Sequence, residues 1–193
     1  MTIACWKKGS GFALLLMAGS LNAADEPVDG NDGLLHVRGA LTESACRLAM
    51  DSAWQDVDMG TTATGALKKP GDQGTPVRVA IRLEDCLPSP TSVRDAWSGD
   101  LLWSQEQPSV TVSFVAPGEL FNPGLVSVTG ASGLALRLTD RQQRPVRLNG
   151  EGHPLLLEPG GNTLFYYIAP ERTPAPLVAG AWQALIHFRL NYD

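Results

Sequence analysis

Apolar and polar residues alternate in several short runs along the chain. The runs are 33–41, 77–83, 110–114 and 134–138, with shorter candidates at 146–148 and 163–168. In each run every second residue lies on the same face of an extended strand. Segments rich in glycine and proline separate the runs, and no long helical period is present. This pattern predicts an all-β chain folded as an antiparallel β-sandwich.

The last run, from Gly180 to Tyr192, has the most regular alternation. Its apolar face carries Trp182, Ala184, Ile186, Phe188, Leu190 and Tyr192. The opposite face is polar in four of its five positions, and the run ends one residue before the chain does. A sandwich of this kind normally closes with a further strand. The sequence therefore predicts an uncovered apolar groove beside an unpaired strand edge.

The N-terminal residues indicate export. Lys7 and Lys8 precede an apolar run at 12–18, and small residues follow at 22–24, so residues 1–23 are predicted to be a secretory signal peptide. The apolar run is much shorter than the roughly 20 residues that span a bilayer. Residues 24–32 are acidic and contain glycine and proline, so we expect a disordered leader.

Residues 24–39 form a predicted N-terminal extension that could act as a donor strand. Gly33, Leu35, Val37 and Gly39 lie on one face of its alternating part. An extended peptide of this pattern can pair with a free strand edge while its alternate side chains fill a groove. Since donor and groove occur in one chain, a head-to-tail polymer is expected.

Two cysteines remain after the signal peptide, Cys46 and Cys86. In an oxidising compartment an intramolecular disulfide is the expected state. Closing a loop of about 40 residues would stabilise the fold by about 4 kcal/mol in the chain-entropy model. The alternative is a reactive or metal-binding pair, which would need further cysteine or histidine ligands at suitable spacing.

The sequence offers few candidates for catalytic or metal-binding residues. The three histidines, His36, His153 and His187, do not form a converging set, and the carboxylates Asp51, Asp56 and Asp58 lack further calcium ligands. We interpret these aspartates as a turn and a solvated face. Motifs for phosphate binding or a serine nucleophile are missing as well. We therefore expect no catalytic residue, no metal, no cofactor and no enzymatic activity.

Charge and aromatic residues limit the binding partners. The formal net charge is −5 and no basic cluster occurs, which argues against nucleic acid and anionic membranes. Five aromatic residues could stack on sugars, so a secreted carbohydrate-binding module is an alternative function. They are Trp97, Trp103, Phe165, Tyr166 and Tyr167. We favour core and loop packing for them. Residues 87–107 are interpreted as a long loop with room for one short helical turn.

Several local patterns together resemble a known family. They are the donor-like extension, Ser44-Ala45-Cys46, the second cysteine in 83–86, the turn at 161–164, and the C-terminal pattern with Gly180 fourteenth from the end and Tyr192 penultimate. The chain resembles fimbrial subunits of the chaperone–usher pathway over essentially its whole mature length. The resemblance implies an incomplete immunoglobulin-like sandwich at 40–193 that lacks its final strand.

The resemblance also implies partners and a location. In this family a periplasmic chaperone caps the terminal strand, here 180–192, until the extension of a neighbouring pilin replaces it by donor-strand exchange. An outer-membrane usher assembles the fibre. The chain is thus expected to pass through the periplasm into a fimbrium at the cell surface, where such fibres serve adhesion.

Within the family, residues 45–60 look most like the terminator and anchor subunit of P-type pili. In that subunit the groove is closed where strand exchange begins, so growth stops at the cell-proximal end. This resemblance implies a minor subunit that terminates the pilus and anchors it at the outer membrane. An ordinary chain-extending major or minor pilin is the alternative.

Overall fold

The structure is a computed structural model that describes residues 35–38 and 44–193. The expected signal peptide and the predicted donor positions Gly33 and Gly39 lie outside these residues. The chain divides into two units, 1–41 and 42–193. In the first unit residues 35–38 have no regular secondary structure, and the side chains of Leu35 and Val37 are exposed.

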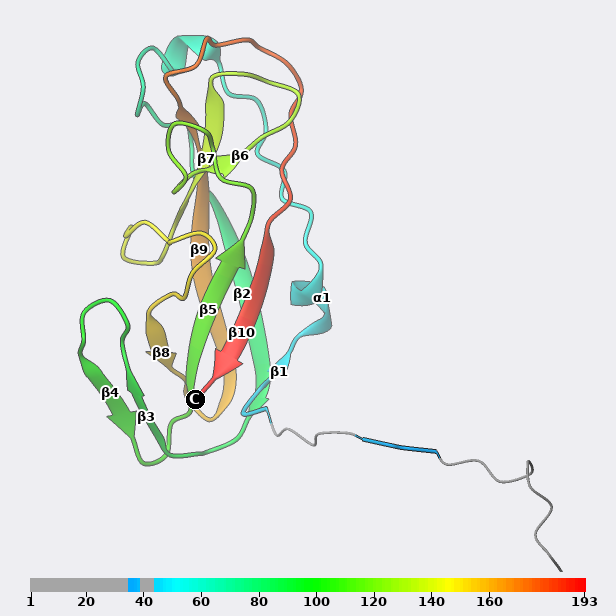
Figure 1. The fold of residues 1–193 in the computed structure, drawn as a ribbon, viewed down its shortest axis with the longest axis vertical. Helices are drawn as coiled ribbons and strands as arrows, with labels where there is room; N and C mark the ends of the chain where they lie inside the picture. The colour runs from blue at the N-terminus through cyan, green and yellow to red at the C-terminus, as the bar shows by residue number, and fades with distance from the viewer. Residues whose placement is uncertain (1–34, 39–43) are drawn as a thin grey trace, which may run out of the picture. The chain divides into compact units, whose positions relative to one another are not determined.

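The described part of the second unit contains two antiparallel sheets that form a sandwich (Figure 1). The five-stranded sheet has the order β1 (Arg47–Leu48), β2 (Val77–Cys86), β9 (Gly160–Arg172), β7 (Leu134–Thr139) and β6 (Val126–Ser127). The three-stranded sheet has the order β10 (His187–Tyr192), β5 (Ser109–Val115) and β8 (Pro154–Leu156). Two short helical elements, α1 (Met50–Ala53) and η1 (Thr64–Ala66), lie between β1 and β2. The all-β sandwich prediction is confirmed.

The hydrophobic core lies between the inward faces of the sheets. Alternation in β2 buries Ile81 and Leu83, and alternation in β5 buries Val110, Val112 and Phe114. Across the core the ring of Phe114 meets that of Tyr166 edge to face, with centroids 4.7 Å apart. Such aromatic pairs add stability beyond the apolar area that they bury.

A disulfide between Cys46 and Cys86 joins the residue before β1 to the last residue of β2. Both cysteines are buried, and beside them Arg47 lies opposite Glu84 in the β1–β2 ladder. The predicted disulfide is therefore confirmed. It crosslinks the beginning of the sandwich to its longest ladder, which β2 forms with β9.

Residues 87–107 form a hairpin, which corrects the predicted loop. Strands β3 (Thr91–Arg94) and β4 (Leu101–Ser104) pair with each other and with no other strand of the described residues. Each strand has only four residues, and Leu101 and Trp103 on β4 are exposed. No alternation of buried apolar residues was therefore visible in the sequence.

The hairpin tip is attached to the segment before β8. Trp97 Nε1 donates a hydrogen bond to the backbone oxygen of Glu151 at 3.0 Å. The Nδ1 atom of His153 lies 2.6 Å from Oδ2 of Asp95. The guanidinium of Arg147 lies over the Trp97 ring. These contacts fix a short hairpin that could not be stable alone in water.

The C-terminal strand is shorter than the sequence predicted. It begins at His187, whereas residues 180–186 are joined to the rest of the sandwich by a bridge between Gln183 and Thr129. Residues 146–148 form no strand either, although Leu148 makes an isolated bridge to Phe114. In both places apolar and polar residues alternate in the sequence. Over most of each run, however, no adjacent strand of the described residues pairs with it in matching register.

Candidate functional site

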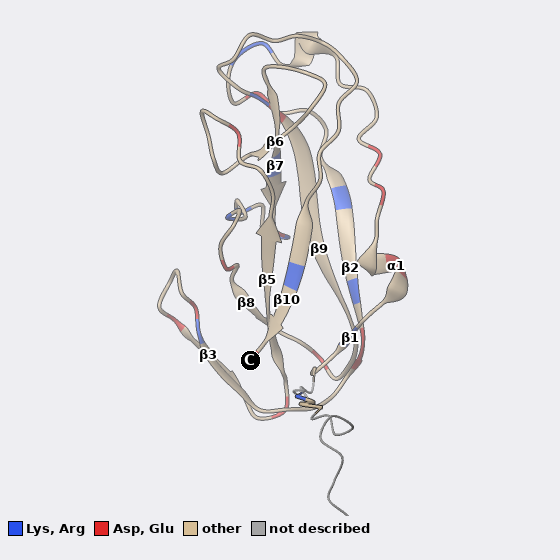
Figure 2. Ribbon diagram, turned by 45° about the vertical axis from the view of Figure 1, so that its right-hand side comes forward, with Lys and Arg blue, Asp and Glu red and all other residues tan. Residues whose placement is uncertain are grey.

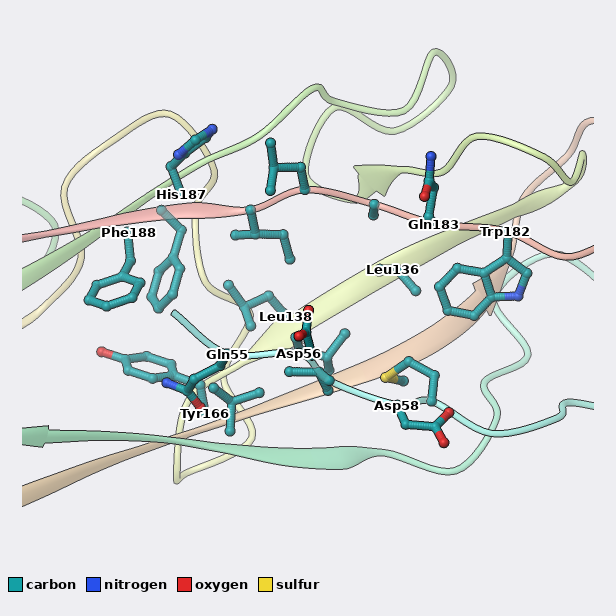
Figure 3. A pocket seen from close by; sticks show the side chains of 18 of the residues that line it. Gln55, Asp56, Asp58, Leu136, Leu138, Tyr166, Trp182, Gln183, His187 and Phe188 are labelled. Carbon is teal, nitrogen blue, oxygen red and sulfur yellow. The ribbon is translucent and has the colours of Figure 1, made fainter. Parts of the chain in front are cut away.

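A groove of about 1090 Å³ lies along the side of the sandwich where β1 and β10 are the outermost strands (Figure 3). One wall is formed by residues 53–62, which start at the last residue of α1, and the other by residues 180–188, which end in the first two residues of β10. The floor is apolar and comes from four strands. Its residues are Val79 and Ile81 of β2, Phe114 of β5, Leu136 and Leu138 of β7, and Tyr166 and Ile168 of β9.

The C-terminal wall points its apolar side chains at the floor. Figure 3 shows Trp182 and Phe188 on the groove side of this segment and Gln183 and His187 on the opposite side. Trp182, Ile186, Phe188, Leu190 and Tyr192 are all half-buried and pack against the core. Of the predicted apolar face only Ala184 is exposed, and Gly180 lines the start of the wall.

Tyr192, the last residue of β10, lies beyond this wall and is half-buried. Its hydroxyl is buried and has no hydrogen-bond partner within the described residues. Burial raises the pKa of this hydroxyl, and burial also raises that of Tyr166 in the floor. A raised pKa favours the neutral form of both phenols, and of the two only Tyr166 lines the groove.

The N-terminal wall is held to β2 mainly by side chains. Helix α1 interrupts the β1 ladder, and the hydroxyl of buried Ser52 then accepts a hydrogen bond from the backbone N–H of Arg82 at 2.9 Å. Gln55 Nε2 donates to the backbone oxygen of Ala80 at 3.0 Å. Asp51 forms an ion pair with Arg82. The wall thus keeps its position although it makes little regular backbone pairing with β2.

Backbone groups on both sides of the groove lack strand partners. Within the described residues β10 pairs only with β5, and β1 pairs only with β2. Each is the outermost strand of its sheet. An unpaired strand edge beside exposed apolar side chains is a template for another extended segment. The geometry is therefore that of a receptor for one added strand.

The aspartates near the N-terminal wall differ in their surroundings. Asp56 and Asp58 line the groove, and their side chains are exposed, whereas Val57 and Met59 between them are half-buried. This alternation across 56–59 is a signal for an extended wall that the sequence interpretation missed. In the described part of the chain no three His, Cys, Asp or Glu side chains form a metal-binding group.

The histidines of the sandwich lie at separate places. His153 contacts Asp95 at the hairpin, and His187 faces away from the groove floor. The Asp95 carboxyl is partly buried, which raises its pKa, but hydrogen bonds from His153 and from the backbone N–H groups of Trp97 and Ser98 outweigh this effect and lower the pKa overall. His153 therefore has a structural role at the hairpin.

Comparison with known proteins gives consistent matches. A family described as fimbrial protein matches residues 35–193. The Fimbria A protein of Serratia marcescens is 30% identical over 175 residues, which cover 89% of this chain and 88% of that protein. The PAP fimbrial minor pilin protein of Escherichia coli is 29% identical over 163 residues, or 84% of this chain and 78% of that protein.

A solved structure supports the fold. The P pilus rod subunit PapA superposes with a TM-score of 0.62 at 23% identity, covering 78% of this chain and all of that one. Across residues 35–38 and 44–193, no helix has the length and apolarity to cross a membrane. The chain belongs to the fimbrial protein family and is a structural, non-enzymatic subunit of a chaperone–usher fimbria at the cell surface, with neighbouring pilin subunits as partners.

Proposed function

We propose that the groove receives the N-terminal extension of a neighbouring subunit and that this chain donates its own extension in turn. The donated strand would place Gly33, Leu35, Val37 and Gly39 toward the floor of the next groove. One observation carries the proposal: β10 lacks a strand partner on the side where the apolar floor lies open. An added strand would pair with β10 and cover that floor at once.

Before a neighbour arrives, the same groove needs protection. Other apolar surfaces would bind to the half-buried side chains of Trp182, Ile186 and Phe188. A free strand edge also promotes aggregation. A periplasmic chaperone that lends a strand along 180–192 would remove both hazards. Transfer to the outer-membrane usher would then bring this groove to the extension of another subunit.

The groove volume of about 1090 Å³ supports a chain-extending role, because space for an added strand exists between the two walls. The second candidate is a minor subunit that terminates the fibre and anchors it at the outer membrane. Its support is the resemblance of residues 45–60 to terminator subunits and the similarity to a PAP fimbrial minor pilin. A terminator would donate its own extension, but its groove would not accept the extension of a neighbouring subunit.

Strand exchange distinguishes the two roles. The subunit is purified together with its chaperone, peptides from the extensions of candidate neighbours are added, and chaperone release is followed over time. Rapid release supports chain extension. Persistent retention, while the peptide 31–41 of this chain still enters another subunit, supports termination. A peptide 31–41 with Leu35→Asp and Val37→Asp is the control, since its inward face can no longer occupy an apolar groove.

A further inference from the structure

We propose that Asp56 and Asp58 form an acidic rim that selects extensions with cationic residues on their outward face. The matched occupant is the extension of a second copy of this chain, which carries His36 and Arg38 at those positions. The inference rests on the proposed function, because it concerns which strand enters the same groove. The acidic rim would influence which partner strand enters the groove, separately from the apolar floor.

The rim is defined by the alternation of residues 56–59. Val57 and Met59 are half-buried, which leaves the carboxylates of Asp56 and Asp58 exposed along the mouth of the groove. Oδ1 of Asp58 accepts a hydrogen bond from the backbone N–H of Gly60 at 2.8 Å, which orients this carboxylate. Neither aspartate forms an ion pair with any described residue, in contrast to Asp51, which is paired with Arg82.

No cation offsets the rim within the groove. Among the described residues that line it, Asp56 and Asp58 are the only carboxylates, and neither lysine nor arginine is present. Figure 2 shows the acidic positions on the segment that continues from α1 beside β2, opposite β10. A strand lying between the two walls would therefore meet two carboxylates on the side of residues 56–58, and exposed Arg189 on the side of β10.

The extension of this chain has the complementary charge at the corresponding positions. Within 33–39 the only ionisable side chains are His36 and Arg38, and both alternate with the inward set that includes Leu35 and Val37. In adjacent strands, side chains on the same face lie about 4.5–5.5 Å apart at the Cβ atoms. Outward residues of an inserted strand thus become neighbours of Asp56 and Asp58. Opposite charges there favour association, and like charges oppose it.

The expected preference for one extension over another is modest, because the rim is exposed to water. Exposed ion pairs give about 0.2–1 kcal/mol each, so two pairs correspond to about a two- to thirtyfold preference. Such pairs act strongly on the rate of association and weaken as salt screens them. An acidic outward face, by contrast, would slow the entry of an extension that fits the apolar floor equally well.

The test compares two peptides on one acceptor. The acceptor is the full chain held by its chaperone, with Leu35→Asp and Val37→Asp so that its own extension cannot compete. The peptides are residues 31–41 in native form and with His36→Glu and Arg38→Glu. Chaperone release is measured at about 0.02 M and about 0.5 M NaCl, which brackets weak and strong screening. Both peptides are compared on the same acceptor. The ratio of their release rates therefore does not depend on how tightly the chaperone holds that acceptor before exchange.

Two acceptor variants locate the effect. Asp56→Lys with Asp58→Lys reverses the rim, and Asp100→Lys with Glu106→Lys makes the same charge change at exposed residues of the hairpin region. We expect the native peptide to exchange about two- to thirtyfold faster on the native acceptor at low salt. We expect the preference to invert on the reversed rim, persist on the hairpin control and shrink at high salt.

Three results would overturn the inference in distinguishable ways. Equal rates for the two peptides on the native acceptor would leave strand acceptance intact and remove the rim as a selector. A preference that survives Asp56→Lys with Asp58→Lys would locate the selecting charge elsewhere. Failure of both peptides on an intact chaperone complex would overturn the rim together with self-acceptance by the groove.

Discussion

Gly180 passes so close to Gly130 that a Cβ atom on Gly180 would lie 2.5 Å from the backbone oxygen of Gly130. The reverse contact is as tight, since a Cβ on Gly130 would collide with the backbone oxygen of Ala181. Gly130 also adopts a φ of +101°, which favours glycine. This pair fixes the point where the C-terminal wall of the groove crosses the turn between β6 and β7.

We expect Gly180→Ala to displace the start of that wall and lower the free energy of unfolding by about 1–3 kcal/mol, the usual cost of overpacking. Urea unfolding of the subunit with a bound donor peptide measures the change. Gly65→Ala is the matched control, because a Cβ there meets nothing within 4 Å. Equal stability of the two variants would contradict the close-approach argument.

Ile186 and His187 offer a neighbouring pair on opposite faces of the wall. Ile186 lines the groove and packs against the core, whereas His187 faces outward. Ile186→Asp should reduce recovery of the chaperone complex about tenfold or more, because a carboxylate would have to be buried beneath the added strand. His187→Asp should leave recovery near the native level. Affinity purification from periplasmic extracts measures both, and similar recovery for the two would refute the proposed mode of capping.

Removal of the disulfide should destabilise the sandwich. Cys46→Ser with Cys86→Ser opens a closed loop whose crosslink is worth about 4 kcal/mol in the chain-entropy model. The measurement is urea unfolding of the peptide-bound subunit, with and without reductant. Reductant should lower the midpoint of the native chain and leave that of the double variant unchanged. A native midpoint that is insensitive to complete reduction would show that the crosslink contributes little.

The hairpin should loosen in acid. Because hydrogen bonds lower the pKa of Asp95 below its ordinary value of 3.8, its contribution to docking is present above about pH 4 and is lost as the pH falls through the lowered pKa. Hydrogen exchange of residues 91–104 between about pH 6 and pH 2.5 measures this, after correction for the intrinsic pH dependence of exchange.

Asp95→Asn should loosen the hairpin already near neutral pH and remove most of the additional change in acid. Asp100→Asn, in the same turn but fully exposed, is the control and should behave like the native chain. If protection of the native hairpin stayed constant over the whole range, the contact between Asp95 and His153 would not be what holds its tip.

The sequence predicted those parts of the fold in which alternation coincides with burial. Strands β2, β5 and β7 contain the predicted runs 77–83, 110–114 and 134–138, whose apolar residues include Ile81, Val112 and Leu138 of the core. The sequence did not predict the hairpin because Leu101 and Trp103 are apolar but exposed, so alternation does not coincide with burial there. Its position depends on the contacts of Trp97 and His153 with residues distant in sequence, and no local pattern encodes such contacts.

The groove was predicted on one side only. The apolar face that includes Trp182, Ile186 and Phe188 was evident from its period of two. The opposite wall depends on Ser52 and Gln55, whose side chains bond to the backbone of β2 in place of a regular ladder. The attachment of this wall through side chains leaves no periodic signal, and only the short alternation across 56–59 marks the wall in the sequence.

The position of the disulfide has a mechanical consequence. Under the proposed strand donation, tension along a fibre would enter each subunit through its extension and reach Cys46 before any strand of the five-stranded sheet. The covalent bond passes this load directly to Cys86 at the end of β2, where the ladder with β9 begins. Residues 47–76, including the wall of the groove after α1, therefore lie outside the path of the force, whereas β2 carries it. The disulfide would then keep the load entering at Cys46 from pulling the wall segment after α1 away from β2.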